Sequence, residues 1–179
     1  MRINTERATT TSNLKVLKKH IDILDVDNPT CTFRINIDVL NEAFGLNRSM
    51  YAKAWYPDSK YSWISAINSK EQFYIWMPKM YSNSSGCKNS ISYDGTKIYE
   101  VIDDPNVVDD SETTDADIYG YNYRHGYRLV FIKESPKSPY RFVGVFRPIK
   151  MEHNNHAFER VATKIKLIRN PATAIEILK

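Results

Sequence analysis

The alternation of apolar and polar residues is strongest between positions 127 and 146. Two apolar runs, Leu129–Ile132 and Phe142–Phe146, flank a polar loop that carries Pro136 and Pro139. This pattern predicts a β-hairpin with a longer connecting loop. The first run is almost continuously apolar, which is typical of a strand buried on both faces, whereas the second alternates with a period of two. Gly144 inside the second run predicts a bulge or a close backbone approach.

Shorter elements are predicted on both sides of this hairpin. The Asp94-Gly95 pair between alternating runs is a strong signal for a second hairpin. Further strands are predicted at Thr30–Ile35, Ser62–Ile67, Gln72–Met77, Ser90–Tyr93, Thr96–Ile102 and, after a helical turn, within Glu159–Ile168. Apolar spacing predicts helices from Leu14 to Leu24 and from Asp38 to Phe44, the second ended by Gly45. We therefore expect an α+β fold with a curved, mostly antiparallel, barrel-like sheet and two or three peripheral helices.

The length of 179 residues predicts one domain. We expect a disordered arm at residues 1–12, a single α+β domain at residues 13–169, and a C-terminal tail or the start of a linker helix at residues 170–179. The N-terminus is polar, and no apolar run approaches the roughly 18–20 residues that cross a bilayer. Cys31 and Cys87 are isolated, which fits a reducing compartment. The sequence thus predicts a cytoplasmic protein without a membrane partner.

The net charge of +4 conceals an asymmetry. Residues 98–123 contain eight acidic residues and no Lys or Arg, so the rest of the chain holds 25 basic residues against 13 acidic ones. A basic body attracts polyanions, of which nucleic acid is the first candidate. Ordinary solvated Lys and Arg on strand faces would give the same count, so charge alone leaves both interpretations open.

Motifs for catalysis, metals and cofactors are weak. Cys87 and His125 could pair as nucleophile and base, but no local signature supports this. The Glu152–His156 string EHNNH lacks a third strong zinc ligand nearby. Lys133-Glu134 has the reverse order of the Glu-x-Lys element of metal-dependent nucleases, and no Walker lysine loop, GxGxxG or HExxH is present. We therefore predict no catalytic residues, no metal site and no cofactor.

The positive signal is the interleaving of aromatic and basic residues. Aromatic faces stack on unpaired bases, and Lys and Arg neutralise phosphates. An aromatic cage with one acid, Asp94 or Asp58, could also bind an extruded base through its exocyclic amine. Packing in an aromatic-rich core is the alternative for each tryptophan. The predicted nucleic-acid-binding residues are Trp55, Tyr56, Trp63, Trp76, Asp94, Tyr121, Tyr123, Arg124 and Arg128.

Three local phrases resemble a known family. They are NSISYDGTKIYE (Asn89–Glu100), YRLVFIKE (Tyr127–Glu134), and YRFVGVF (Tyr140–Phe146) with the later FERVA (Phe158–Ala162). Together they resemble PUA-like and SRA-like barrels that accompany nucleases in bacterial restriction systems. The resemblance covers roughly residues 89–165. It implies a DNA-binding module that senses a modified or specific base, flipped into an aromatic pocket.

Three functional hypotheses follow from the sequence. The first is a non-catalytic specificity module of a restriction or defence system that binds double-stranded DNA with a modified base, any nuclease activity residing in a partner domain or subunit. The second is a small metal-dependent nuclease with an unrecognised carboxylate site. The third is a protein-interaction domain whose acidic segment, residues 103–117, binds a basic partner.

Overall fold

The fold was analysed in a computed structural model that describes residues 21–48, 54–56, 64–81, 86–103, 125–152, 154–170 and 172–179. The predicted N-terminal arm, most of the first predicted helix and nearly all of the acidic segment lie outside these residues. So do the predicted site residues Trp63, Tyr121, Tyr123 and Arg124, together with Asp58.

In the described part of the chain, twelve strands form one sheet. The strands are β1 (Ile23–Asp25), β2 (Thr32–Phe33), β3 (Trp55–Tyr56), β4 (Ile64–Ala66), β5 (Gln72–Trp76), β6 (Cys87–Ile91), β7 (Lys97–Ile102), β8 (Tyr127–Lys133), β9 (Tyr140–Glu152), β10 (Asn155–Ala162), β11 (Lys164–Asn170) and β12 (Ala172–Leu178). Their order is β1-β11-β12-β4-β5-β8-β9-β10-β7-β6, with β2 paired to β9 and β3 to β5. The β4–β12 and β5–β8 pairs are parallel, and the other named pairs are antiparallel.

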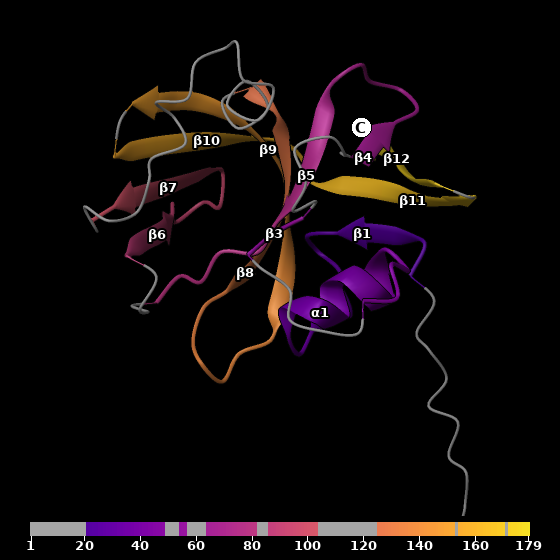
Figure 1. Cartoon of the computed structure of the whole chain (residues 1–179), viewed down its shortest axis with the longest axis horizontal. Coiled ribbons are helices and arrows are strands. Elements are labelled where there is room, and N and C mark those ends of the chain that lie inside the picture. The colour runs from indigo at the N-terminus through magenta and orange to yellow at the C-terminus, as the bar shows by residue number, and fades with distance from the viewer. Residues whose placement is uncertain are drawn as a thin grey trace, which may run out of the picture.

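The sheet is curved, and its two halves spread to either side of the β8–β9 hairpin (Figure 1). A single helical segment, α1 (Asn36–Asp38) continued by the π-helical η1 (Val39–Ala43), stands in the described residues where two or three helices were expected. Gly45 ends it with a φ of +67°, as predicted. The predicted α+β class with a curved, mostly antiparallel sheet is confirmed. No helix within the described ranges is long and apolar enough to cross a membrane.

The β8–β9 hairpin lies between two apolar cores. Leu129 and Phe131 of β8 pack into the larger core, with the helical segment, β1, β11 and β12. Val130 and Ile132 pack into a second, smaller core with β7 and β10. All five residues from position 128 to 132 are buried. The predicted two-sided burial of this strand is therefore confirmed, and its near-continuous apolar run follows from it.

The predicted irregularity at Gly144 is also present. β8 pairs Val130 with Gly144 and Phe131 with Phe142, so β9 has one extra residue there. Strict alternation predicted Val143 and Val145 on the same face, but Val143 belongs to the second core and Val145 to the larger one. The bulge reverses the inside–outside phase of the strand. One strand thereby supplies side chains to both cores along its length.

Both ends of the domain differ from expectation. Ile23–Asp25, predicted as the end of a helix, forms the edge strand β1 against β11. Residues 172–178, predicted as a tail or the start of a helix, form β12 between β11 and β4. Ile175 and Ile177 recur with a period of two, and hydrogen bonding on both sides outweighs the helix propensity of the neighbouring Ala, Glu and Leu.

The polar segment after Pro148 continues the strands β9 and β10. β9 continues to Glu152 and β10 begins at Asn155, so the polar stretch lies in a tight hairpin. The predicted helical turn before Ile168 is strand as well, since β10 and β11 are separated by Thr163 alone. Extended pairing with β7 and β9 gives these polar residues backbone partners.

Replacing Gly144 by alanine should destabilise the fold strongly. Its φ is +122°, and an added Cβ would lie 2.6 Å from the backbone oxygen of Ala162. We expect a loss of more than about 3 kcal/mol in the free energy of unfolding, because backbone strain of about 1–3 kcal/mol adds to this overlap. Urea unfolding measures it. Gly45→Ala, where φ is +67° and no atom lies within 4 Å of the new Cβ, should cost only about 1–2 kcal/mol. Equal losses in the two variants would contradict this account.

Candidate functional site

A cavity of about 480 Å³ opens where the ends of β5, β8 and β9 face β6 and β7. The segment that follows β5 forms one wall, and the β6–β7 hairpin forms another. Its volume is within the range of ligand pockets in proteins. The cavity therefore lies at the boundary between the central hairpin and the smaller half of the sheet.

The register of β6, β7 and β10 places three polar side chains in one row. Asn89 lies opposite Glu100, and Glu100 lies opposite His156. Directly paired residues project from the same face of a sheet. This is the inner face, because Ile98 and Phe158, two positions away along β7 and β10, belong to the second core. The polar row thus crosses an otherwise apolar surface, and Asn89 and Glu100 form part of the cavity wall.

Glu100 and His156 form a buried hydrogen-bonded pair. The distance from His156 Nδ1 to Glu100 Oε2 is 3.0 Å, and the two side chains are 0% and 7% exposed. A carboxylate is costly to bury unless a donor satisfies it. With Nδ1 protonated, the imidazole donates to Glu100 and fixes the direction of the carboxylate. His156 therefore explains how a carboxylate is held inside the apolar half of the sheet.

Asn89 carries a buried acceptor beside this pair. Its Nδ2 donates to the backbone oxygen of Lys79 at 3.3 Å, which fixes the amide plane. Its Oδ1 is buried and has no hydrogen-bond partner in the structure. Buried polar atoms in proteins are usually satisfied, so such an atom in a cavity wall is typical of a site that a ligand completes. The cavity thus offers two adjacent acceptors, an amide oxygen and a carboxylate.

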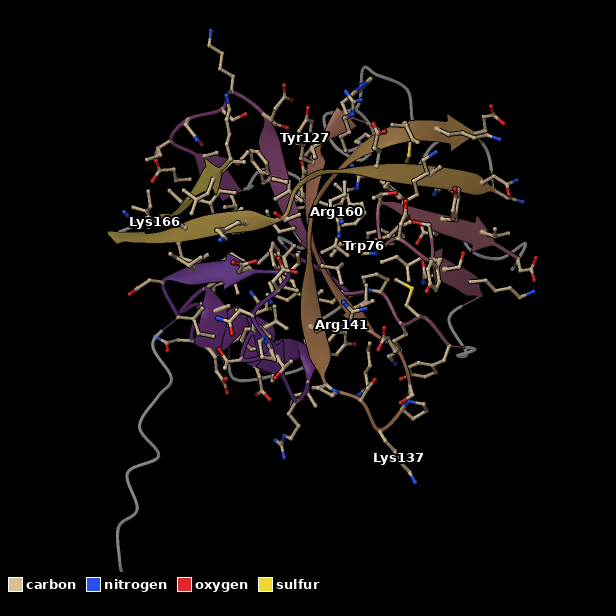
Figure 2. The ribbon with its side chains drawn as sticks, turned by 180° about the vertical axis from the view of Figure 1, so that it is seen from behind. Trp76, Tyr127, Lys137, Arg141, Arg160 and Lys166 are labelled. Carbon is tan, nitrogen blue, oxygen red and sulfur yellow. The ribbon has the colours of Figure 1, made fainter. Side chains whose placement is uncertain are left out.

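The apolar and aromatic wall includes Trp76, Tyr81 and Tyr140. Trp76 is 1% exposed, and its ring centroid lies 4.9 Å from that of Phe158 at an interplanar angle of 53°. Figure 2 shows it between the central hairpin and the smaller half of the sheet. The sequence left core packing and ligand binding open for each tryptophan. Trp76 packs in the core and also lines the cavity.

Arg128 is a core residue rather than a surface cation. It is fully buried, its guanidinium carbon lies 4.7 Å from the Phe158 ring centroid, and it donates to the backbone oxygen of Gly126. The β8 alternation places it on the same face as Val130, toward the second core. In this position the guanidinium group is stacked on an aromatic ring and is not exposed to solvent, where a DNA phosphate would lie.

Asp94 does not lie at the cavity. It is exposed at the β6–β7 turn, where its Oδ1 accepts hydrogen bonds from the Ser92 hydroxyl at 2.6 Å and the Thr96 amide at 3.1 Å. These two bonds and a third from the Thr96 hydroxyl lower the pKa of Asp94 to about 2. The carboxylate is thereby used within its own turn, and Gly95 takes the φ of +69° that the turn requires.

Two further predicted residues, Trp55 and Tyr56, form β3. They pair with Trp76 and Ile75 of β5. Their backbone therefore lies next to the strand that ends at the cavity, and Ala54 contributes to its wall. Of the predicted set, Trp76 lines the cavity, Trp55 and Tyr56 lie on the adjoining strand, and Arg128 and Asp94 lie elsewhere.

The sequence carried a signal for the residues that were missed. Glu100 is in phase with Ile98 and Ile102, both inward-facing, and His156 is in phase with Phe158. A charged residue at an inward position of an alternating strand indicates a buried polar site. Asn89 could be identified only from the strand pairing, because its place opposite Glu100 is what assigns it to the polar row.

The suggested catalytic pair and the possible metal ligands do not form a site in the described residues. Cys87 lines this cavity, whereas His125 lines a second one of about 440 Å³ near Arg147 and Lys150. The suggested nucleophile–base pair is therefore not formed. Within the described ranges, no group of three or more His, Cys, Asp or Glu side chains could hold a metal ion.

Replacing Asp94 by asparagine should destabilise the hairpin at neutral pH. The carboxylate has a folded pKa of about 2 against an ordinary value of 3.8, so its stabilisation is complete above the ordinary value and is lost as the pH falls toward 2. The stability difference between wild type and Asp94→Asn should therefore close between pH 3.8 and about 2. Urea unfolding at a series of pH values measures this. A difference that stays constant across that interval would contradict it.

Replacing His156 should separate hydrogen bonding from packing. His156→Leu leaves Glu100 without its donor, and we expect a loss of about 1–3 kcal/mol in the free energy of unfolding. His156→Asn places an amide donor close to the position of Nδ1 and should lose less than the leucine variant. Urea unfolding at neutral pH compares them. A leucine variant as stable as the wild type would show that the pair contributes nothing to the fold.

Comparisons with known proteins agree with this architecture. No curated protein sequence matches the chain. Among solved structures, the 5-hydroxymethylcytosine-specific restriction enzyme AbaSI is similar with a TM-score of 0.56 and 22% sequence identity, covering 81% of this chain and 42% of the AbaSI chain. At this identity the likeness shows the fold, and this chain spans less than half the length of AbaSI. The family model described as the SET and RING associated (SRA) domain matches residues 18–167, which include the whole cavity wall. This match confirms the predicted resemblance. The chain therefore belongs to the SRA domain family.

Proposed function

We propose that this domain binds double-stranded DNA and recognises a modified base that is extruded from the duplex into the cavity. The observation that carries the proposal is the buried, unsatisfied Oδ1 of Asn89 beside the carboxylate of Glu100. Two acceptors on adjacent strands select a ligand with two adjacent hydrogen-bond donors. The aromatic wall supplied by Trp76 and Tyr140 suits a flat ring.

The chemistry of the two acceptors favours a cytosine with a donor on C5. The exocyclic N4 amine of cytosine donates, and Glu100 would accept from it. A 5-hydroxymethyl group adds a hydroxyl donor next to that amine, which Asn89 Oδ1 would accept. A 5-methyl group has no donor and would leave Oδ1 unsatisfied, at a cost of about 1–3 kcal/mol. The specificity named for AbaSI, 5-hydroxymethylcytosine, supports this choice.

Extrusion is required because these groups are inside the domain. Glu100 is 5% exposed, so a base paired within a duplex could not approach it. Enzymes and readers that act on such atoms rotate the nucleotide out of the stack and bind it in a closely fitting pocket. The basic body, with 25 Lys and Arg residues against 13 acidic ones outside residues 98–123, provides the general attraction to DNA.

The restriction context is part of the same proposal. The chain is similar to a part of a restriction enzyme and spans 42% of its length. We propose that it acts as a non-catalytic specificity module, and that cleavage resides in a nuclease domain or subunit that acts with it. The acidic residues of the alternative interaction hypothesis lie almost entirely outside the described residues, so no observation favours that hypothesis.

A binding panel with variants tests the proposal. Wild-type protein should bind a duplex containing 5-hydroxymethylcytosine at least about tenfold, or about 1.4 kcal/mol, more tightly than the unmodified duplex. Glu100→Gln keeps the shape and an acceptor for His156 but removes the charge, and should weaken binding of both cytosine-containing duplexes, because both bases present the N4 amine. Asn89→Leu should bind hydroxymethylated and methylated duplexes equally. Fluorescence polarisation with C, 5-methylcytosine, 5-hydroxymethylcytosine and N6-methyladenine duplexes, and with single strands, measures these affinities.

Glu71→Gln is the matched control, because Glu71 is exposed in the β4–β5 loop and does not line the cavity. It should behave as wild type. Equal affinity of the wild type for every duplex would refute base recognition, and an unchanged affinity in Glu100→Gln would refute its assignment to this cavity.

A further inference from the structure

We propose that Lys79 and Lys133 together bind one backbone phosphate that flanks the nucleotide entering the cavity. This inference rests on the proposed function and adds a second recognition element to the same site. Both lysines line the cavity, at the ends of β5 and β8, whereas the polar row lies on β6, β7 and β10. The two elements come from different strands and can be tested separately.

The backbone holds the two lysines next to each other. Lys79 and Lys133 form a parallel bridge that extends the β5–β8 pairing beyond the end of β5. The Met80 amide donates to the Lys133 oxygen at 2.8 Å, and the Lys133 amide donates to the Pro78 oxygen at 3.1 Å. Paired residues of neighbouring strands project to the same side. The positions of both side chains are thus fixed by regular strand geometry rather than by a free loop.

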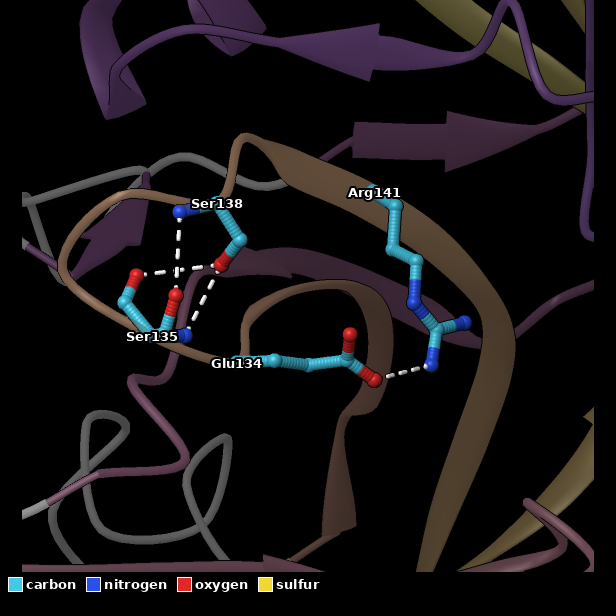
Figure 3. Close-up of polar contacts among 4 residues, drawn as sticks. All are labelled: Glu134, Ser135, Ser138 and Arg141. Carbon is cyan, nitrogen blue, oxygen red and sulfur yellow. Dashed lines mark hydrogen bonds and ion pairs between the residues drawn. The ribbon is translucent and has the colours of Figure 1, made fainter.

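Neither ammonium group has a carboxylate partner among the described residues. Glu134 follows Lys133 directly in the chain, but its Oε1 accepts from Arg141 Nη2 at 2.7 Å (Figure 3). Glu100, the carboxylate in the cavity wall, is bonded to His156. Two adjacent like charges repel each other, so this arrangement is most stable when an anion lies between them. The Glu134–Arg141 pair therefore leaves the lysines available to an external anion.

The surrounding hairpin restricts the motion of Lys133. Its Nζ lies 5.6 Å from the ring centroid of Tyr140, a cation–π contact that orients the side chain across the base of the loop. Within the loop, the Ser135 amide donates to Ser138 Oγ at 2.8 Å and the Ser138 amide donates to Ser135 Oγ at 3.1 Å (Figure 3). A loop closed by reciprocal bonds loses little entropy on binding. Lys133 is thereby preorganised for its ligand.

The chemistry of the site suits a phosphodiester. Lysine binds phosphate as a point charge with three rotatable donors, whereas arginine binds through a rigid planar fork. A base that occupies the inner end of the cavity leaves its sugar and flanking phosphates at the mouth, where Lys79 is exposed. Free phosphate has the same chemistry but brings no base, and a competition experiment distinguishes the two sources.

The test uses the double variant Lys79→Gln/Lys133→Gln on a duplex with one 5-hydroxymethylcytosine. We expect at least about tenfold weaker binding at 0.1 M salt, and a slope of log K against log salt concentration that is smaller by about one, as for the loss of one phosphate contact. Replacing the flanking phosphodiester by a neutral methylphosphonate should weaken wild-type binding similarly and should not weaken the double variant further. Lys133→Arg keeps the charge and should keep the slope.

The matched control is Lys70→Gln/Lys166→Gln. Lys70 lies in the loop before β5, at the opposite end of that strand from Lys79, and Lys166 is exposed on β11 (Figure 2). This control should retain the full effect of the methylphosphonate. Thermal unfolding confirms that each variant is folded, and inorganic phosphate at millimolar concentration should not compete with the duplex.

The outcomes separate this inference from the proposed function. An unchanged slope in the double variant, or a methylphosphonate effect equal in wild type and double variant, overturns the phosphate site. Competition by inorganic phosphate assigns the lysines to a free anion and overturns the proposal as well. In each of these cases the preference for the modified over the unmodified duplex, which depends on Asn89, still reports on base recognition.

Discussion

The structure depends on burying one β-hairpin on both faces. A strand with two buried faces supplies alternate residues to two cores, and β8 does this with Leu129 and Phe131 on one side and Val130 and Ile132 on the other. β9 must do the same over a longer path, and the bulge at Gly144 reverses its phase. Because a Cβ at that position would lie 2.6 Å from the Ala162 oxygen, only glycine lets β9 and the end of β10 approach so closely. The close approach of these two strands therefore depends on one residue.

The candidate site is a consequence of this arrangement. The smaller core is closed by β7 and β10, and the same inner face that carries Ile98 and Phe158 carries Glu100 and His156 one pair further along. An apolar surface makes a carboxylate expensive, so the imidazole is needed to hold it there. The same low-polarity surroundings strengthen any hydrogen bond that Glu100 makes to a ligand. The low polarity around Glu100 thus causes both the cost of burying its carboxylate and the strength of the hydrogen bond that it would make to a ligand.

Much of the fold was predictable from the sequence, because local rules decided it. The Asp94-Gly95 turn, the helix that ends at Gly45 and the central hairpin each depend on neighbouring residues. The site was less predictable. Arg128 lies in a strand buried on both faces, where alternation no longer distinguishes inside from outside, so a basic residue was assigned to the surface. Residues 172–178 had a helical composition, and only the strands on either side, which sequence does not reveal, made them a strand.

The strand register explains why the residues of the proposed site were not identified from the sequence. Asn89, Glu100 and His156 lie on three different strands, and only Glu100 and His156 have a local signal, as polar residues at inward positions. Their relation exists only across strands, in the pairing of β6 with β7 and of β7 with β10. Lys79 and Lys133 are related in the same way, through the pairing of β5 with β8. Because one sheet carries both sets, a shift of one residue in any of these pairings would turn the side chains away from the cavity. The selective recognition that we propose would therefore be a property of strand register, which the two-sided burial of the central hairpin keeps in place.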